Sequence, residues 1–330
     1  MLLRDRADPD FHDARTALAR ALCLTADNDN FAEAERLCAA VLETCREAHG
    51  PRHPKVATAM ADLSKVLRAS EKLDEAVPLA REAVELMKDV GGAEVATDMS
   101  RELMVLLHQA GELEEALAVG RELVPRLEEH CGAVNAVTLQ ATVDLVRVLQ
   151  DAGAVDEGLG HIQNVVKKAK NKFGKRHGFT IMAMGMMVEL QKESGNFVEA
   201  EKGAREIVKA VKSECGKKHP STIDNMGTLV LLLGDIGKTK EAEELSKEVV
   251  ALSRHVHGPE DVDTLRYEYQ AAKVLRQAGK LDACKAAIAA LLPVMRRVKD
   301  DNNDGELDDE AFDSALEEAT QLASELACGT

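Results

Sequence analysis

Four oxygen-bearing side chains near the C-terminal end of the chain could bind Ca²⁺. Asp300, Asn302, Asp304 and Asp308 stand at the first, third, fifth and ninth places of one short segment, and Gly305 stands at the sixth. Calcium prefers carboxylate and amide oxygens, and a glycine at the sixth place allows the sharp turn that such a loop needs. The segment is therefore a candidate calcium-binding loop.

This segment resembles an EF-hand loop, but its last ligand position is Ala311, where that loop has a bidentate glutamate. Because two ligand oxygens are missing, we expect weak or vestigial calcium binding, with a working calcium sensor as one alternative. The interpretation we favour is an acidic turn followed by a polar helix over residues 308–327. The apolar face of that helix would close the end of the fold through Phe312, Leu316, Leu322 and Leu326.

Cys45, His49 and His53 follow one another at four-residue spacing, as metal ligands on one helix could. Gly50 and Pro51 stand before His53, so only the first two share a helix face, and we expect no zinc site. The sequence contains no P-loop, GxSxG, HExxH or dinucleotide-binding glycine pattern. We therefore expect no enzyme, and no cofactor other than the weak calcium.

The elements that carry these residues follow from a glycine repeat. Two interleaved sets of glycines recur at 42-residue intervals, namely Gly153, Gly195, Gly237 and Gly279, and then Gly132, Gly174, Gly216 and Gly258. Glycine ends helices because it reaches positive φ at little cost. Apolar residues three and four apart fill the intervals, which is helical spacing. Each period is therefore predicted to be helix, turn, helix, turn, and a repeat of this length indicates an array of stacked units.

Composition narrows the range of partners. The formal net charge is −16, aromatic residues are 2% and Trp is absent, which disfavours nucleic acids as partners. No apolar stretch is long enough to span a membrane, so we expect no membrane insertion. The seven cysteines are odd in number and contain no CxxC pair, which indicates a reducing compartment. We expect a cytoplasmic protein.

The repeat resembles the tetratricopeptide repeat in the 42-residue form of kinesin light chains. The resemblance rests on GKKHPSTIDNMGTLVLLLGDIGKTKEAEELSKEVVALSRHVHG, from Gly216 to Gly258. It implies an all-α, right-handed superhelical solenoid of about seven helix-turn-helix repeats with a C-terminal capping helix. The array would cover residues 1–299 and the acidic turn and capping helix residues 300–330, with units near 11–50, 51–92, 93–132, 133–174, 175–216, 217–258 and 259–299.

The resemblance also implies that the first helix of each unit lines a concave groove for a partner peptide or helix. Transferred position by position, it gives three rows on the first helices. The candidate groove residues are Asp62, Lys65, Asp98, Glu102, Gln140, Asp144, Arg147, Met182, Met186, Arg266, Gln270 and Lys273. Within a helix the rows are four and three residues apart, so they share one face. We expect Met187 to lie in the core.

Two charged features allow two interpretations each. Asp62, Glu102 and Asp144 could attract a basic partner, or could be neutralised by nearby cations such as Lys65 and Arg147. The basic run at residues 167–177 could bind an acidic partner or be a solvated helix end. We expect a protein-interaction scaffold that binds a protein or peptide in the groove. The alternatives are a calcium-responsive adaptor and an architectural subunit of a larger assembly.

Overall fold

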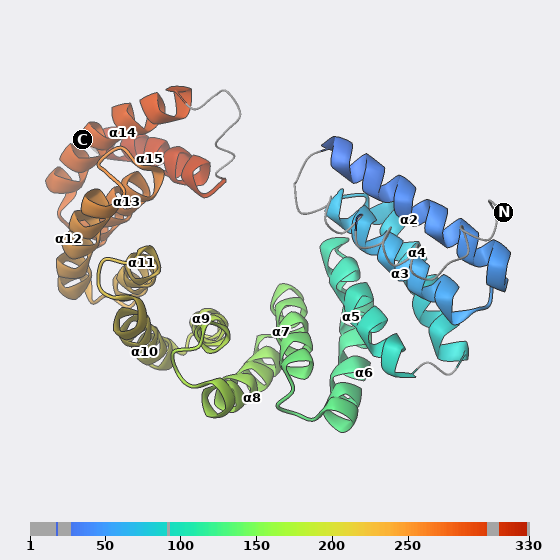
Figure 1. Ribbon diagram of the computed structural model, residues 1–330. Coiled ribbons are helices and arrows are strands. Elements are labelled where there is room, and N and C mark those ends of the chain that lie inside the picture. The colour runs from blue at the N-terminus through green and yellow to red at the C-terminus, as the bar shows by residue number, and fades with distance from the viewer. Residues whose placement is uncertain (1–17, 19–27, 91–92, 302–309, 329–330) are drawn as a thin grey trace. The chain divides into compact units, whose positions relative to one another are not determined.

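The computed structural model describes residue 18 and residues 28–90, 93–301 and 310–328, and this part of the chain contains fourteen α-helices and no strand. The helices are α2 (Asn28–His49), α3 (Pro54–Ala69), α4 (Leu73–Asp89), α5 (Ala93–Gln109), α6 (Leu113–Cys131), α7 (Ala136–Asp151), α8 (Val155–Phe173), α9 (Gly178–Glu193), α10 (Phe197–Cys215), α11 (Pro220–Asp235), α12 (Thr239–Val256), α13 (Val262–Gln277), α14 (Leu281–Asp301) and α15 (Glu310–Cys328). Figure 1 shows them in order. The predicted all-α array is confirmed.

Two kinds of helix alternate along the chain. We call α3, α5, α7, α9, α11 and α13 first helices, and α2, α4, α6, α8, α10, α12 and α14 second helices. The chain forms two compact units, unit 1 from Met1 to Lys168 and unit 2 from Ala169 to Thr330. In unit 1 each helix from α2 to α7 packs on the next, and α3 also contacts α5, which contacts α7. In unit 2 the helices from α9 to α15 pack in the same sequential way, and α11 contacts α13.

The turn glycines take the conformation that the repeat predicts. Gly153 has φ 72° and Gly237 has φ 78°, and all the glycines of both 42-residue sets have positive φ. We call the turn between a first helix and the second helix that follows it an inner turn. At the inner turns with glycine, the N–H after the glycine bonds to a carbonyl of the last helical turn, as Lys238 N does to Leu233 O at 2.8 Å. These bonds satisfy carbonyls that a helix end would otherwise leave unpaired.

One inner turn lacks glycine. Glu71 stands there with φ 60°, the only non-glycine residue with positive φ in the described part of the chain. Lys72 N still bonds to Leu67 O at 2.9 Å, as Glu112 N bonds to Leu107 O at 2.8 Å after Gly111. Glu71 therefore adopts the backbone of its glycine counterpart and retains the steric cost of a Cβ.

We expect Glu71→Gly to stabilise unit 1 by about 1 kcal/mol, because it removes that steric cost. The matched change Gly111→Glu should destabilise the same unit by a similar amount. Urea unfolding followed by circular dichroism measures both. Equal midpoints for wild type and Glu71→Gly would contradict this account of the turn.

The N-termini of the first helices are capped by side chains at one repeat position. His53, His177 and His219 each accept a hydrogen bond at Nδ1 from the backbone N–H two residues later, at 3.2 Å. Asn135 and Asp261 accept the same bond through oxygen, at 2.9 and 3.0 Å. These contacts satisfy N–H groups that have no partner within the helix. The histidines at the repeat turns therefore stabilise helix ends.

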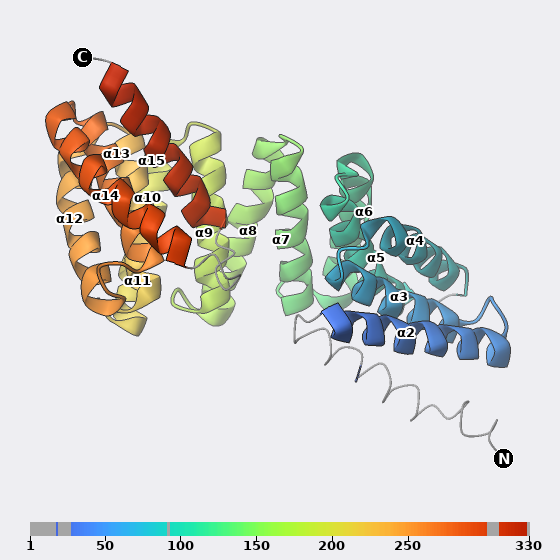
Figure 2. The ribbon, with the colours of Figure 1, turned by 90° about the horizontal axis from the view of Figure 1, so that it is seen from above.

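Helix α15 closes the C-terminal end of unit 2. Phe312, Leu316, Leu322 and Leu326 are buried, and α15 packs on both α13 and α14, along which it lies in Figure 2. The expected capping helix is therefore present, beginning at Glu310. Asp300 belongs to the last turn of α14, whereas Asn302, Asp304 and Asp308 lie outside the described residues. Calcium binding stays a prediction.

Candidate functional site

The candidate groove residues lie on the first helices, where most of them are at least partly open to solvent. In each unit, we call the surface that they form the first-helix face of that unit. Asp98 and Arg147 are exposed, and the half-buried members are Asp62, Lys65, Glu102, Gln140, Met182, Met186, Arg266, Gln270 and Lys273. Asp144 is the exception, with 7% of its surface exposed. A carboxylate buried to this extent needs partners.

Cations neutralise the acidic row of unit 1. Arg101 Nε donates to Asp144 Oδ2 at 2.8 Å, and Arg68 Nε donates to Glu102 Oε1 at 2.7 Å. Both bonds connect neighbouring first helices. Lys65 lies 3.9 Å from Asp62, and Arg147 lies 3.9 Å from Asp144.

The bonds of Arg68 and Arg101 join residues that are 34 and 43 positions apart in sequence, and they were not predicted. Gln140 also contributes a bond at 3.2 Å to Asp144, so the row is a set of ion pairs within unit 1. The geometry favours the interpretation of neutralisation over that of an acidic field. Binding of a basic partner at this row stays a prediction.

The first-helix face is apolar at α9. Ile181, Met182, Met186 and Met187 are half-buried, whereas Met184 is fully buried. The expectation that Met187 lies in the core was wrong, since helical rotation places Met184 there instead. Gly185 lies between the two expected groove methionines, and a Cβ on Gly185 would have no atom within 4 Å. Met182 and Met186 are four residues apart and therefore share one face of α9. Partly exposed apolar side chains gathered in this way are typical of contact surfaces.

The C-terminal part of this face is polar and closely paired. Tyr267 donates its hydroxyl hydrogen to Asp224, and Arg266 bonds to Asp263 at 2.6 Å. Burial, followed by the bond to Asp224, raises the pKa of Tyr267 well above its usual value. The Tyr267 hydroxyl and the Arg266 guanidinium therefore already have carboxylate partners here.

Helix α15 supplies the carboxylates for the end of α13. Tyr269 donates to Glu318 at 2.9 Å, and Lys273 donates to the same carboxylate at 3.0 Å. Arg276 bonds to Glu325 at 2.7 Å. These three contacts fix α15 against α13, and they engage Lys273, one of the predicted groove residues, within the chain itself.

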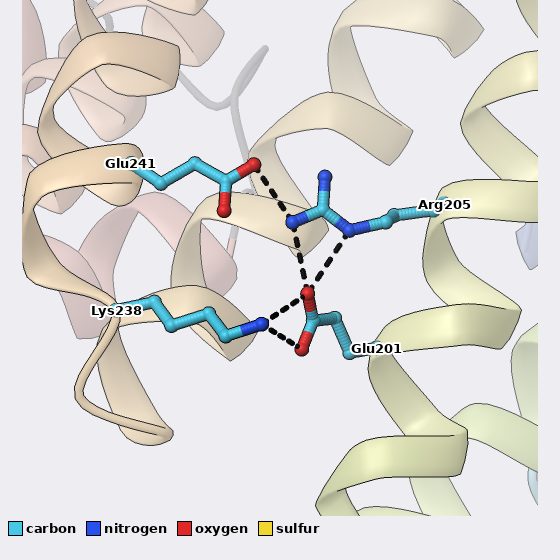
Figure 3. Close-up of polar contacts among 4 residues, drawn as sticks. All are labelled: Glu201, Arg205, Lys238 and Glu241. Atoms are coloured by element: carbon cyan, nitrogen blue, oxygen red, sulfur yellow. Dashed lines mark hydrogen bonds and ion pairs between the residues drawn. The ribbon is translucent and has the colours of Figure 1, made fainter.

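The second helices carry a ladder of ion pairs between successive repeats. In Figure 3, Glu201 of α10 accepts hydrogen bonds from Arg205 and from Lys238, and Arg205 also reaches Glu241 of α12. Lys238 lies 2.7 Å from both oxygens of Glu201. Lys238, followed by Arg205, lowers the pKa of the Glu201 carboxyl.

Similar ion pairs join successive second helices in other repeats. Lys280 bonds to Glu243 at 2.7 Å, and Arg121 bonds to Glu157 at 2.6 Å. In pairs of this kind the two residues are 34 to 37 positions apart in sequence. This separation takes the chain from one second helix to the next second helix, or to the turn before it. We call these contacts the ion-pair ladder. Their periodicity indicates a structural role in joining repeats.

The basic run at residues 167–177 takes part in such pairing. Lys168 bonds to Glu128 at 2.8 Å within unit 1. Lys170 bonds to Glu206 at 2.9 Å within unit 2 and lowers the pKa of that carboxyl. The geometry favours a structural role for this basic run over the binding of an acidic partner.

Depressions also lie between successive second helices. One of them, with a volume of about 630 Å³, lies between α12 and α14 and is also lined by α13. Val250, Leu291 and Val294 contribute apolar surface to it, and the exposed Ala290 lies at its edge. This depression, which we call the second-helix depression, is an alternative contact surface.

One group of side chains in the described part of the chain could hold a metal ion. The ligand atoms of His257, Asp261 and Asp263 lie within 4.8 Å of one another. Both carboxylates already have structural partners, since Asp261 caps α13 and Asp263 binds Arg266. Cys45, His49 and His53 do not form such a group among the described residues, and the rings of the two histidines stack at 4.5 Å.

Repeat comparison could have found this group. Only the turn at residues 257–263 has potential ligands at all three positions, whereas the matching turn one repeat earlier has Ser221 at the third.

Among the helices of the described residues, none is long and apolar enough to cross a membrane.

Comparisons with known proteins agree with the architecture. Models of the tetratricopeptide repeat family match residues 13–89 and residues 222–263. No curated protein matches the sequence.

Solved structures with a similar fold share little sequence with the chain. TPR-like repeats assigned to a kinesin light chain of Podosopora anserina are 18% identical, with a TM-score of 0.57 over 61% of this chain and 94% of that one. BtubC from P. vanneervenii is 14% identical, with a TM-score of 0.57 over 72% and 95%. A tetratricopeptide repeat protein from Parabacteroides merdae is 15% identical, with a TM-score of 0.53 over 92% and 99%.

Proposed function

Because this chain is a tetratricopeptide repeat protein, we propose that it is a scaffold that binds a partner protein on the first-helix face of unit 2, at α9. The role is one of binding and not of catalysis. The observation that carries the proposal is the apolar, half-buried surface of Met182 and Met186 around Gly185. Several charged side chains of the first helices already have partners within the chain, among them Arg266 and Lys273 in unit 2. The two thioethers can instead adapt to an incoming surface.

The partner is proposed to be an extended peptide or a helix that presents apolar side chains. An apolar surface gains free energy on contact roughly in proportion to the area removed from water. Charged partner residues would have to compete with existing pairs such as Arg266 with Asp263. The contact at α9 should therefore dominate the affinity, as a few central residues usually do.

Two variants that substitute lysine for apolar residues test this proposal. Met182→Lys with Met186→Lys places two charges on the proposed surface, and Ala290→Lys places one at the edge of the second-helix depression. Proteins captured from the native source by wild type should be lost from the double variant and kept by Ala290→Lys. Circular dichroism should show equal helicity, since all three positions are at least partly exposed.

Two results would count against the proposal. A captured protein that binds the double variant as tightly as wild type does not use α9. A protein that is lost only from Ala290→Lys would move the binding function to the second-helix depression.

A further inference from the structure

Unit 2 contains one internal example of an aromatic ring packed on a helix glycine. A methyl group on Gly227 of α11 would lie 2.8 Å from Tyr267 Cε1 and 3.2 Å from Tyr267 Cδ1. Tyr267 belongs to α13, is 3% exposed, and donates its hydroxyl hydrogen to Asp224. The missing Cβ of Gly227 therefore makes room for the ring of the next first helix.

The same glycine position exists one repeat earlier without its ring. Gly185 of α9 stands 42 residues before Gly227, and Asn225 stands 42 residues before Tyr267. Asn225 turns back along its own helix and donates to Ser221 O at 2.7 Å. A Cβ on Gly185 would meet no atom within 4 Å. The α9 position thus has the glycine but not the aromatic side chain that fills the space in the following repeat.

Resting on the proposed function, we propose that a phenylalanine side chain of the bound partner packs on Gly185, in the place that Tyr267 occupies on Gly227. We call this position the Gly185 notch. Glycine in a helix interior is less stable than alanine, and among the described residues no atom lies within 4 Å of a Cβ placed on Gly185. In this proposal, Gly185 leaves room for the close approach of the ligand.

The residue that replaces Asp224 specifies phenylalanine over tyrosine. Met182 stands 42 residues before Asp224. The Gly185 notch therefore has a thioether at the position where Asp224 accepts the hydrogen bond of the Tyr267 hydroxyl. Sulfur makes favourable contacts with aromatic rings. A tyrosine hydroxyl placed there would lose its hydrogen bonds to water and gain at most a weak acceptor.

Selection of binding peptides tests the proposal on the full chain. Random linear peptides displayed on phage are selected on wild type, and the recovered peptides are measured against three variants. Asn225→Tyr fills the notch from within by copying Tyr267, and Gly185→Leu fills it from α9. Asn225→Ala removes the same amide without filling the space and is the matched control.

We expect the recovered peptides to share a phenylalanine whose replacement by alanine weakens binding about tenfold or more. Both filling variants should weaken binding to a similar extent, and Asn225→Ala should not. Replacement of that phenylalanine by tyrosine should weaken binding about tenfold. Met182→Asp supplies the acceptor and should reverse this preference.

A direct measurement accompanies the selection. N-acetyl-phenylalanine methylamide is titrated into protein with ¹³C-labelled methionine methyl groups. Ring currents should shift the Met182 and Met186 signals in wild type and in Asn225→Ala, but not in Asn225→Tyr. The absence of any such shift in wild type overturns the proposal.

The outcomes separate the two levels of inference. Peptides that are lost on Met182→Lys but bind Asn225→Tyr as tightly as wild type leave the α9 surface in place and overturn the Gly185 notch. Peptides that bind both variants unchanged overturn the notch and the proposed function together. A preference for tyrosine in wild type also overturns the assignment of the ring.

Discussion

Tyr267→Ala is expected to destabilise unit 2 by about 3 to 5 kcal/mol, the range for removing a buried aromatic side chain. The ring is almost fully buried and packs where Gly227 lacks a Cβ, so its removal leaves a cavity between α11 and α13. Tyr267→Phe keeps the ring and loses only the bond to Asp224. Its cost should be smaller, about 1 to 2 kcal/mol, since Asp224 is exposed and can bind water.

Urea unfolding followed by circular dichroism measures both changes. Asn225→Ala is the control, because Asn225 occupies the same repeat position on α11 and is only half-buried. It should change the free energy of unfolding by less than about 0.5 kcal/mol, as is usual away from the core. If Tyr267→Ala costs no more than the control, the packing of α13 on Gly227 does not hold the two helices together.

Acid should destabilise the array through the ion-pair ladder. Lys247, followed by Lys280, lowers the pKa of Glu243 from 4.5 to about 2, and the pKa values of Glu201, Glu206 and Glu157 are lowered by their own partners. A carboxyl whose pKa is lower in the folded state binds protons more tightly when unfolded. The contribution of Glu243 to stability is therefore complete above pH 4.5 and is lost as the pH falls towards about 2.

Thermal unfolding midpoints measured between pH 7 and pH 2 test this expectation. The midpoint should fall most steeply below pH 4.5, and Glu243→Gln should lower it at neutral pH while flattening the acid dependence. Glu244→Gln, at an exposed position that joins no ion pair among the described residues, should match wild type. An unchanged acid slope in Glu243→Gln would remove Glu243 from the explanation. High salt should weaken the effect, because the partners are partly exposed.

Much of the fold could be predicted because its signals are local. A glycine at positive φ ends a helix by its own backbone preference, so Gly153 and Gly237 mark turns without any knowledge of the neighbours. The apolar spacing of the helix after Glu310 likewise predicted the buried Phe312 and Leu316. Glu71 is the exception that sequence reading passes over, because nothing local indicates that this glutamate adopts the glycine conformation.

The candidate site was harder because its contacts connect residues far apart in sequence. Arg101 meets Asp144 only when two first helices stack with a particular rotation, and a spacing rule within one helix finds Arg147 instead. Met187 was expected in the core but is half-buried, whereas Met184 is fully buried, through a similar difference in rotation. Comparison of repeats position by position could have found the contrast of Asn225 with Tyr267. It could not have shown that Gly185 faces open space.

The placement of the two tyrosines makes the chain its own optical probe. Tyr267 and Tyr269 are the only tyrosines, and Trp is absent, so intrinsic fluorescence comes almost entirely from α13 in unit 2. Circular dichroism, in contrast, averages over the helices of both units. Coincident transitions by different probes are the usual evidence that unfolding is all-or-none. Separate fluorescence and dichroism midpoints would instead resolve the melting of unit 2 from that of the remainder without any added label.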